Sequence, residues 1–136
     1  MIILSNTTAQ TLEPGQSITF NTVVMHTGNG ECHRPGTSRV KLRNTGIYKL
    51  SFSGNVSTAT VGNVAQLNIA LGGEVLPETT MKSTTATGGV NTFNNVATTT
   101  AYKNCCGDYD QVTVVNTGTS ALTLDANPVL SIKRVS

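Results

Sequence analysis

Three cysteines and two histidines are the side chains best suited to metal or nucleophilic chemistry. Cys32 directly precedes His33, and Cys105 and Cys106 are adjacent to each other. Neighbouring residues of an extended strand point to opposite faces, which disfavours a shared metal ion or a Cys–His dyad at either pair. A zinc site that combines Cys32, both histidines and one of the cysteine pair has suitable ligands, but no Cys-x-x-Cys spacing supports it. We therefore predict no metal site and no catalytic residue.

The redox state of the cysteines is open between two interpretations. An odd number of cysteines in a chain without a secretion signal argues against a disulfide framework and favours unpaired thiols. The alternative is one disulfide that joins Cys32 to Cys105 or Cys106 after release from a reducing cytosol.

The acidic residues offer little chemistry. Asp108 and Asp110 place two carboxylates on one side of a loop, where they either bind calcium or, as we favour, only solvate the loop. The other acids are scattered without a general acid–base pair, so we predict that the protein is not an enzyme and carries no cofactor. Tyr102 and Tyr109 flank the same segment, and loops on rigid β-scaffolds commonly carry recognition. Tyr102, Asp108, Tyr109 and Asp110 therefore form a candidate recognition loop, together with residues 27–37.

A basic cluster precedes the middle of the chain, with few acids nearby. It either lines an acidic partner surface or, as we favour, is a solvated strand face; its members are Arg34, Arg39, Lys41, Arg43 and Lys49. The formal net charge is only +2, which gives no electrostatic footprint for nucleic acid or an anionic membrane.

The length and composition indicate one β-rich domain. The 136 residues contain 23 Thr, 13 Asn and 10 Ser, small polar types that favour strands and turns over helices. The longest apolar run near the N-terminus, Met1 to Leu4, is far shorter than a membrane span or the core of a signal peptide. We therefore expect neither membrane insertion nor a secretion signal.

Alternation with period two runs through most of the chain. From Tyr48 to Val56 the even positions are apolar or glycine and the odd positions are polar, and similar alternation recurs around Ile18–Val24, Val40–Leu42, Ala65–Leu71 and three later segments. Turn signals at intervals of about ten residues separate these runs, and Leu71-Gly72-Gly73-Glu74-Val75 predicts a two-residue hairpin. We predict a single all-β sandwich of eight to ten short strands.

Two segments suggest assembly. Residues 90–102 carry threonine and asparagine on both faces, which favours a strand packed on a symmetry mate over an exposed strand or a misassigned loop. The candidate interface residues are Phe93, Val96, Thr98 and Tyr102. We also predict that residues 1–15 form an N-terminal arm or a first strand, with the jelly-roll domain at residues 16–136. In the arm hypothesis, Ile2, Ile3 and Leu4 are buried on a neighbouring subunit or particle surface.

Five alternating segments form a pattern known from one family; they are Ile18–Val23, Asn44–Leu50, Leu67–Pro77, Val112–Asn116 and Leu130–Val135. The second joins a tight glycine turn to an aromatic residue and an alternating strand, and the third contains a hairpin that ends in proline. On these segments, over about residues 16–135, the chain resembles the complement-C1q/TNF-like jelly-roll family, in particular the C-terminal domains of Bacillus exosporium collagen-like proteins and small structural proteins of Firmicutes phages. The resemblance implies a ten-stranded jelly roll, a compact homotrimer and no catalysis.

We therefore expect a non-enzymatic structural protein of a bacteriophage virion. The first hypothesis is a trimeric capsid decoration or head auxiliary protein that binds the major capsid protein or other virion proteins. The alternative is a tail-fibre or surface adhesin module whose loops bind a host glycan or protein. In either case we expect synthesis in the host cytoplasm without a signal peptide, and a final location on the particle surface.

Overall fold

The computed structural model describes residues 1–28, 30–58, 60, 62–84, 93–103 and 110–135. These residues form thirteen strands and one short 3₁₀ helix, η1 (Pro77–Thr79). The strand count exceeds the expected eight to ten because five of the strands have only two or three residues. Among the described residues, no helix has the length and apolar character needed to cross a membrane.

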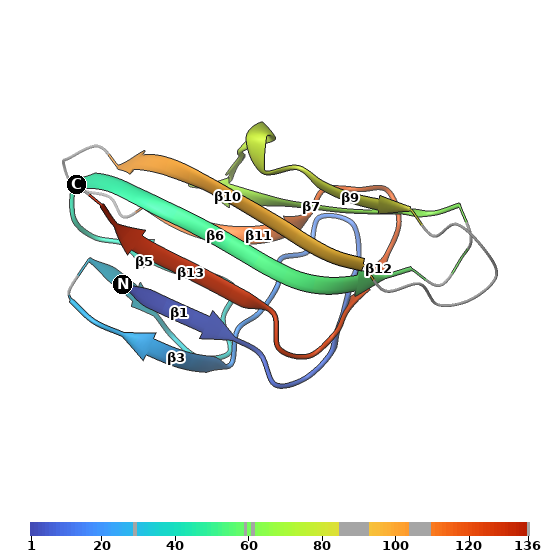
Figure 1. Ribbon diagram of the computed structural model, residues 1–136, viewed down its shortest axis with the longest axis horizontal. Coiled ribbons are helices and arrows are strands. Elements are labelled where there is room, and N and C mark those ends of the chain that lie inside the picture. Colours follow the sequence, from blue (N-terminus) through green and yellow to red (C-terminus); the bar gives the residue numbers. More distant parts are fainter. Residues whose placement is uncertain (29, 59, 61, 85–92, 104–109, 136) are drawn as a thin grey trace.

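The strands pair into two antiparallel sheets that face each other, so the predicted all-β sandwich is confirmed (Figure 1). The seven-stranded sheet contains β1 (Ile2–Ser5), β2 (Gln10–Leu12), β3 (Thr22–His26), β6 (Gly46–Ser57), β10 (Phe93–Lys103), β12 (Leu122–Leu124) and β13 (Val129–Arg134). The six-stranded sheet contains β4 (Glu31–His33), β5 (Val40–Leu42), β7 (Val64–Leu71), β8 (Glu74–Val75), β9 (Met81–Thr84) and β11 (Asp110–Asn116).

Strand β6 is the centre of the seven-stranded sheet. One of its edges pairs with β10 from Gly46 to Val56, and its other edge pairs with β13 and then with β12. The even residues of β6 are buried in the core as the alternation predicts, and Tyr48, Leu50 and Phe52 are completely buried. Because successive side chains of a strand alternate, the odd residues of β6 face away from the sandwich.

The core lies between the two sheets and receives apolar side chains from nearly every described strand. Its members from the six-stranded sheet include Val40, Leu42, Leu67, Ile69, Val112 and Val114, and those from the seven-stranded sheet include Leu122, Leu124, Leu130 and Ile132. Gly54 of β6 also faces inward, where a methyl group would lie 2.9 Å from Leu124 Cδ1. Glycine at this position lets two core side chains approach the backbone.

Of the two alternatives for residues 1–15, the structure shows the first strand and no separate arm, because β1 and β2 are part of the sandwich. Strand β1 pairs with β13 on one edge and with β3 on the other, all within the chain, so it has no free edge for a neighbour. Ile2 and Leu4 are 1% and 0% exposed in the chain's own core, whereas Ile3 is half-buried on the opposite face. The run Ile2-Ile3-Leu4 is apolar throughout because Ile2 and Leu4 lie in the core and Ile3, on the opposite face, is itself half-buried.

The predicted strand from Ile18 to Val24 is partly wrong. Ile18 and Phe20 are buried, but they belong to a segment outside the named strands that pairs through single bridges, Ser17 to Val115 of β11 and Phe20 to Thr37. The strand β3 begins only at Thr22, and Val24 is 61% exposed at a bulge.

The predicted hairpin at Leu71–Val75 is confirmed. Leu71 pairs with Glu74, and the two glycines between them have positive φ angles of 61° and 86°. Such angles are accessible to glycine without steric cost, which explains why two glycines occupy this turn.

One end of the sandwich is closed by buried polar groups. The Tyr48 hydroxyl donates a hydrogen bond to the Asn44 carbonyl at 2.8 Å, and the Met1 ammonium lies 3.3 Å from the buried Glu31 carboxylate. Burial raises the pKa of Tyr48 above its usual value of 10.0, and the negative charge of Glu31 raises it further.

Candidate functional site

The outer surface of the seven-stranded sheet is an unusually uncharged face, which we call the open face. One row of side chains crosses five strands and consists of Thr98, Ser51, Ser131, Ile3 and Met25. The row beside it consists of Val96, Ser53, Val129 and Ser5. Figure 1 shows the five strands β10, β6, β13, β1 and β3 side by side in one layer. Both rows contain only small hydroxyl and apolar side chains.

Exposed apolar side chains concentrate on this sheet. Val96 is 58% exposed, Met25 44% and Val129 39%. The hydroxyl oxygens of Ser51 and Thr98 lie 3.4 Å apart, so these two polar groups are within hydrogen-bonding distance of each other. A sheet face in permanent contact with water normally carries charged side chains in alternation, whereas this composition is typical of a surface that packs on protein.

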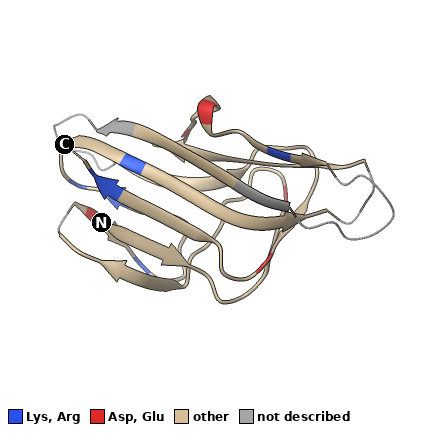
Figure 2. Ribbon diagram, in the orientation of Figure 1, with Lys and Arg blue, Asp and Glu red and all other residues tan. Residues whose placement is uncertain are grey.

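Among the described side chains of the open face, charge appears at one end. Lys49 and Lys133 lie directly opposite each other across β6 and β13, and both are exposed. Elsewhere Lys and Arg are distributed over both sheets instead of forming one stripe (Figure 2).

The predicted interface residues fall on β10, an edge strand that pairs only with β6 in the described part of the chain. Val96 and Thr98 are both exposed and project onto the open face. Phe93 and Tyr102 belong to the same strand, but their side chains lie outside the described residues. Trimer contact by these four residues stays a prediction.

The cysteine and recognition-loop predictions fall largely outside the described residues. Cys105, Cys106, Asp108 and Tyr109 are not described, and for Tyr102 and Asp110 only the backbone strand is. Cys32 is half-buried on β4, and both of its candidate disulfide partners lie outside the described residues. The disulfide, the calcium site and the recognition loop therefore remain predictions.

His33 holds loop backbone instead of joining a reactive cluster. Its ring nitrogens lie 2.8 Å from the Arg39 carbonyl oxygen and 2.9 Å from that of Phe20, whose ring it meets edge-on. In the described part of the chain, no group of three or more His, Cys, Asp or Glu side chains is placed to hold a metal ion.

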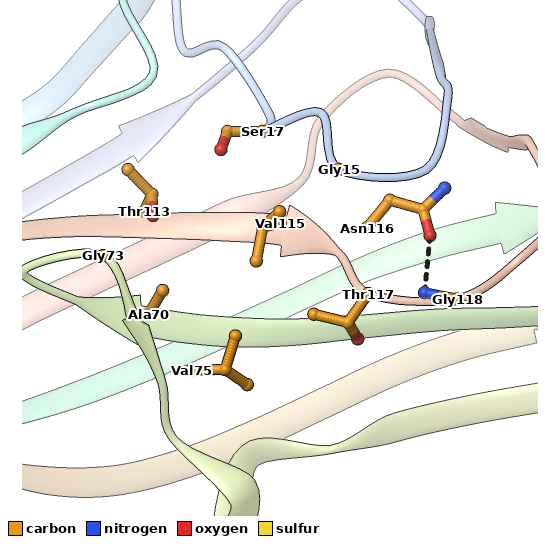
Figure 3. Close-up of a pocket in the computed structure, with 10 residues that line it drawn as sticks. All are labelled: Gly15, Ser17, Ala70, Gly73, Val75, Thr113, Val115, Asn116, Thr117 and Gly118. Carbon is orange, nitrogen blue, oxygen red and sulfur yellow. Dashed lines mark hydrogen bonds between the residues drawn. The ribbon is translucent and has the colours of Figure 1, made fainter.

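A groove of about 480 Å³ on the outer surface of the six-stranded sheet was not predicted from the sequence (Figure 3). Its floor comes from β7 and β11, through Ala70, Thr113 and Val115, and its walls come from turns around Gly15, Gly73 and Gly118. These lining side chains are small, and none of them is titratable. Small residues carry no chemical signature in a sequence, which is why the groove could not be anticipated from the sequence.

Asn116 lies at one end of the groove, but its side chain is hydrogen-bonded to three backbone groups of the protein. Its amide nitrogen donates to the carbonyl oxygens of Leu12 and Ser120, each at 3.0 Å, and its amide oxygen accepts the backbone N–H of Gly118 at 3.0 Å (Figure 3). Asn116 therefore fixes the shape of the groove and has little capacity to bind a ligand itself.

Comparison with known proteins identifies the fold. No family model matches the chain, and no curated protein sequence matches it. Among solved structures, Eiger TNF from S. frugiperda superposes with a TM-score of 0.78 at 8% identity, over 99% of this chain and 91% of that one. The globular domain of zebrafish complement 1qA protein gives 0.68 at 10% identity, over 99% and 96%. The PRD1 vertex protein P5 gives 0.56 at 12% identity, over 99% and 94%. The chain therefore has the C1q/TNF-like jelly-roll fold, as its sequence resemblance led us to expect.

Proposed function

We propose that this protein is a non-enzymatic structural subunit of a bacteriophage virion, which assembles as a homotrimer and decorates the capsid surface. The observation that carries the proposal is the middle of the open face, an uncharged surface of exposed valines, a methionine and small hydroxyl side chains on the seven-stranded sheet. Three copies arranged around one axis would cover this surface by apolar burial and close packing of small side chains. The resemblance to phage structural proteins and the fold shared with the PRD1 vertex protein support the virion setting.

The oligomeric state tests the first half of the proposal. Light scattering coupled to size exclusion should give three times the chain mass of 14.2 kDa. Val96→Asp places a charge at an exposed position of the open face, so the variant should remain folded and elute as a monomer. Val64→Asp is the matched control, because Val64 is 37% exposed but belongs to the six-stranded sheet.

The trimer should also persist at about 0.5 M NaCl, because salt screens charge and the middle of the open face carries none. A wild-type monomer would contradict the trimer, as would a Val96→Asp variant that assembles as well as Val64→Asp.

The location of the protein in the particle tests the second part of the proposal, that it decorates the capsid surface. Mass spectrometry of purified virions combined with immunogold electron microscopy should find many copies over the head. Absence from the particles would refute a virion role altogether.

The groove on the six-stranded sheet supports a second candidate function, a tail-fibre or adhesin module that binds a host glycan or protein. The groove is about 480 Å³ in volume and presents hydroxyl groups from Ser17, Thr113 and Thr117. A few copies at a distal fibre tip, in place of many on the head, would favour this candidate.

A further inference from the structure

The structure divides the basic cluster of the sequence between the two sheets. Lys49 lies on the open face, whereas three other members surround a separate hollow of about 230 Å³ beside β4 and β5. The residues that line this hollow, which we call the basic hollow, are Cys32, Arg34, Thr37, Arg39 and Lys41. It belongs to the six-stranded sheet and therefore stays accessible when the open face is covered.

Backbone and side-chain hydrogen bonds fix the walls of the basic hollow. Cys32 lies directly opposite Lys41 across the β4–β5 pair. The turn that follows β4 is closed by Thr37, whose backbone N–H and hydroxyl donate to the Arg34 carbonyl oxygen at 3.1 and 2.7 Å. The ring of His33 lies against the Arg39 carbonyl oxygen on the other side. The three cationic residues thus extend from a backbone frame that is already ordered.

The Phe20 backbone anchors the same turn to the rest of the sandwich. Its N–H donates to the Thr37 carbonyl oxygen at 3.1 Å, and its carbonyl oxygen accepts the Gly36 N–H at 2.8 Å. The backbone of the basic hollow therefore needs little rearrangement for binding, so the entropic cost of holding a ligand is confined to ordering the cationic side chains.

Positive charge dominates the basic hollow. Arg34 and Arg39 are both exposed, and neither forms an ion pair with an acid in the described part of the chain. Glu31, the acid nearest in sequence, is 3% exposed and lies instead at 3.3 Å from the Met1 ammonium. Guanidinium groups present planar pairs of N–H donors that match the oxygens of phosphate, sulfate and carboxylate.

We propose that the basic hollow binds an oxyanion group, a phosphate, sulfate or carboxylate, with Arg34 and Arg39 as the principal donors and Lys41 as a supporting charge. The volume of about 230 Å³ corresponds to roughly eight water molecules, enough for one oxyanion and part of the group that carries it. The proposal assigns binding and no chemical step.

Calorimetric titration of the full-length protein at constant ionic strength tests this site. The probes are sodium phosphate, glucose 6-phosphate and sodium galacturonate, with sodium chloride as the reference. We expect saturable binding of at least one oxyanion in the millimolar range. The variants Arg34→Gln and Arg39→Gln should each weaken oxyanion binding at least fivefold. The backbone carbonyl oxygens of these two residues can still accept their hydrogen bonds, so the fold should be retained. Lys82→Gln is the matched control, since it removes one positive charge from β9, away from the basic hollow.

The outcomes separate site binding from general attraction. A loss confined to the two arginine variants, with unchanged thermal unfolding, supports the site. Tighter binding of glucose 6-phosphate than of phosphate identifies a sugar-borne anion as the source, and equal binding identifies the free anion. Lack of saturation by every probe, or equal weakening by Lys82→Gln, overturns the proposal. None of these outcomes depends on whether the protein forms a trimer.

Discussion

Replacement of Asn116 by alanine should destabilise the protein more than almost any other polar substitution. The side chain is 0% exposed, and its three hydrogen bonds join β11 to the carbonyl oxygens of Leu12 and Ser120 and to the N–H of Gly118. Alanine leaves these three backbone groups without that partner, in a place that water reaches poorly.

The magnitude follows from the count of bonds. Each intramolecular hydrogen bond contributes about 0.5–1.5 kcal/mol net, so three bonds give a loss of about 1.5–4.5 kcal/mol. A domain of this kind has a total stability of about 5–15 kcal/mol, which makes the loss easy to measure. Asn116→Asp retains the shape and the acceptor but loses both donated bonds, so it should be destabilised by a comparable amount at neutral pH.

The assay is unfolding in urea, followed by circular dichroism at one fixed protein concentration, because oligomerisation makes stability depend on concentration. Asn55→Ala on β6 is the control, since Asn55 is exposed and its substitution should change the free energy of unfolding by less than about 0.5 kcal/mol. Equal stabilities for Asn116→Ala and Asn55→Ala would refute the reasoning.

Two further predictions test the core and its response to pH. Gly54→Ala should lower the free energy of unfolding by about 1–3 kcal/mol, because the added methyl group would lie 2.9 Å from the Leu124 side chain; an unchanged urea midpoint would show that the core yields easily. The raised pKa of Tyr48 means that the folded state favours the neutral phenol, so this contribution to stability is complete below pH 10 and is lost as the pH rises through the folded-state value. Titration of phenolate absorbance should therefore show one of the three tyrosines ionising late, and Tyr48→Phe should remove that late phase, whereas simultaneous ionisation of all three would contradict the inferred burial effect.

Alternation predicted the strands wherever one face of a strand meets the core and the other meets solvent. Strand β6 shows this most clearly, because its apolar side chains from Tyr48 to Val56 are all buried. The pattern failed at β1, where partial cover on the outer face permits apolar residues on both sides. It also failed between Ile18 and Phe20, whose burial comes from a crossing segment with isolated bridges and not from a continuous ladder.

The sequence could not predict which of the two sheets each strand belongs to. Lys41 and Lys49 are close in the chain, yet β5 and β6 belong to different sheets, so one residue faces the basic hollow and the other the open face. The sequence also could not predict where a side chain takes the place of a strand in bonding the backbone of another segment. The Gln10 amide bonds both the N–H and the carbonyl oxygen of Thr19, at 3.0 and 2.9 Å, and so imitates a strand partner.

The pairing of β1 with β13 has a consequence for how the protein folds. Ile2 lies opposite Ile132, so β1 must wait until β13, about 130 residues later in the chain, has been synthesised before the ladder between them can close. Folds dominated by such distant pairings fold slowly, since the entropy of a large loop is lost before the contacts form. Until then Ile2, Ile3 and Leu4 remain an uncovered apolar segment in the nascent chain, and this segment is where a chaperone would bind or aggregation would begin.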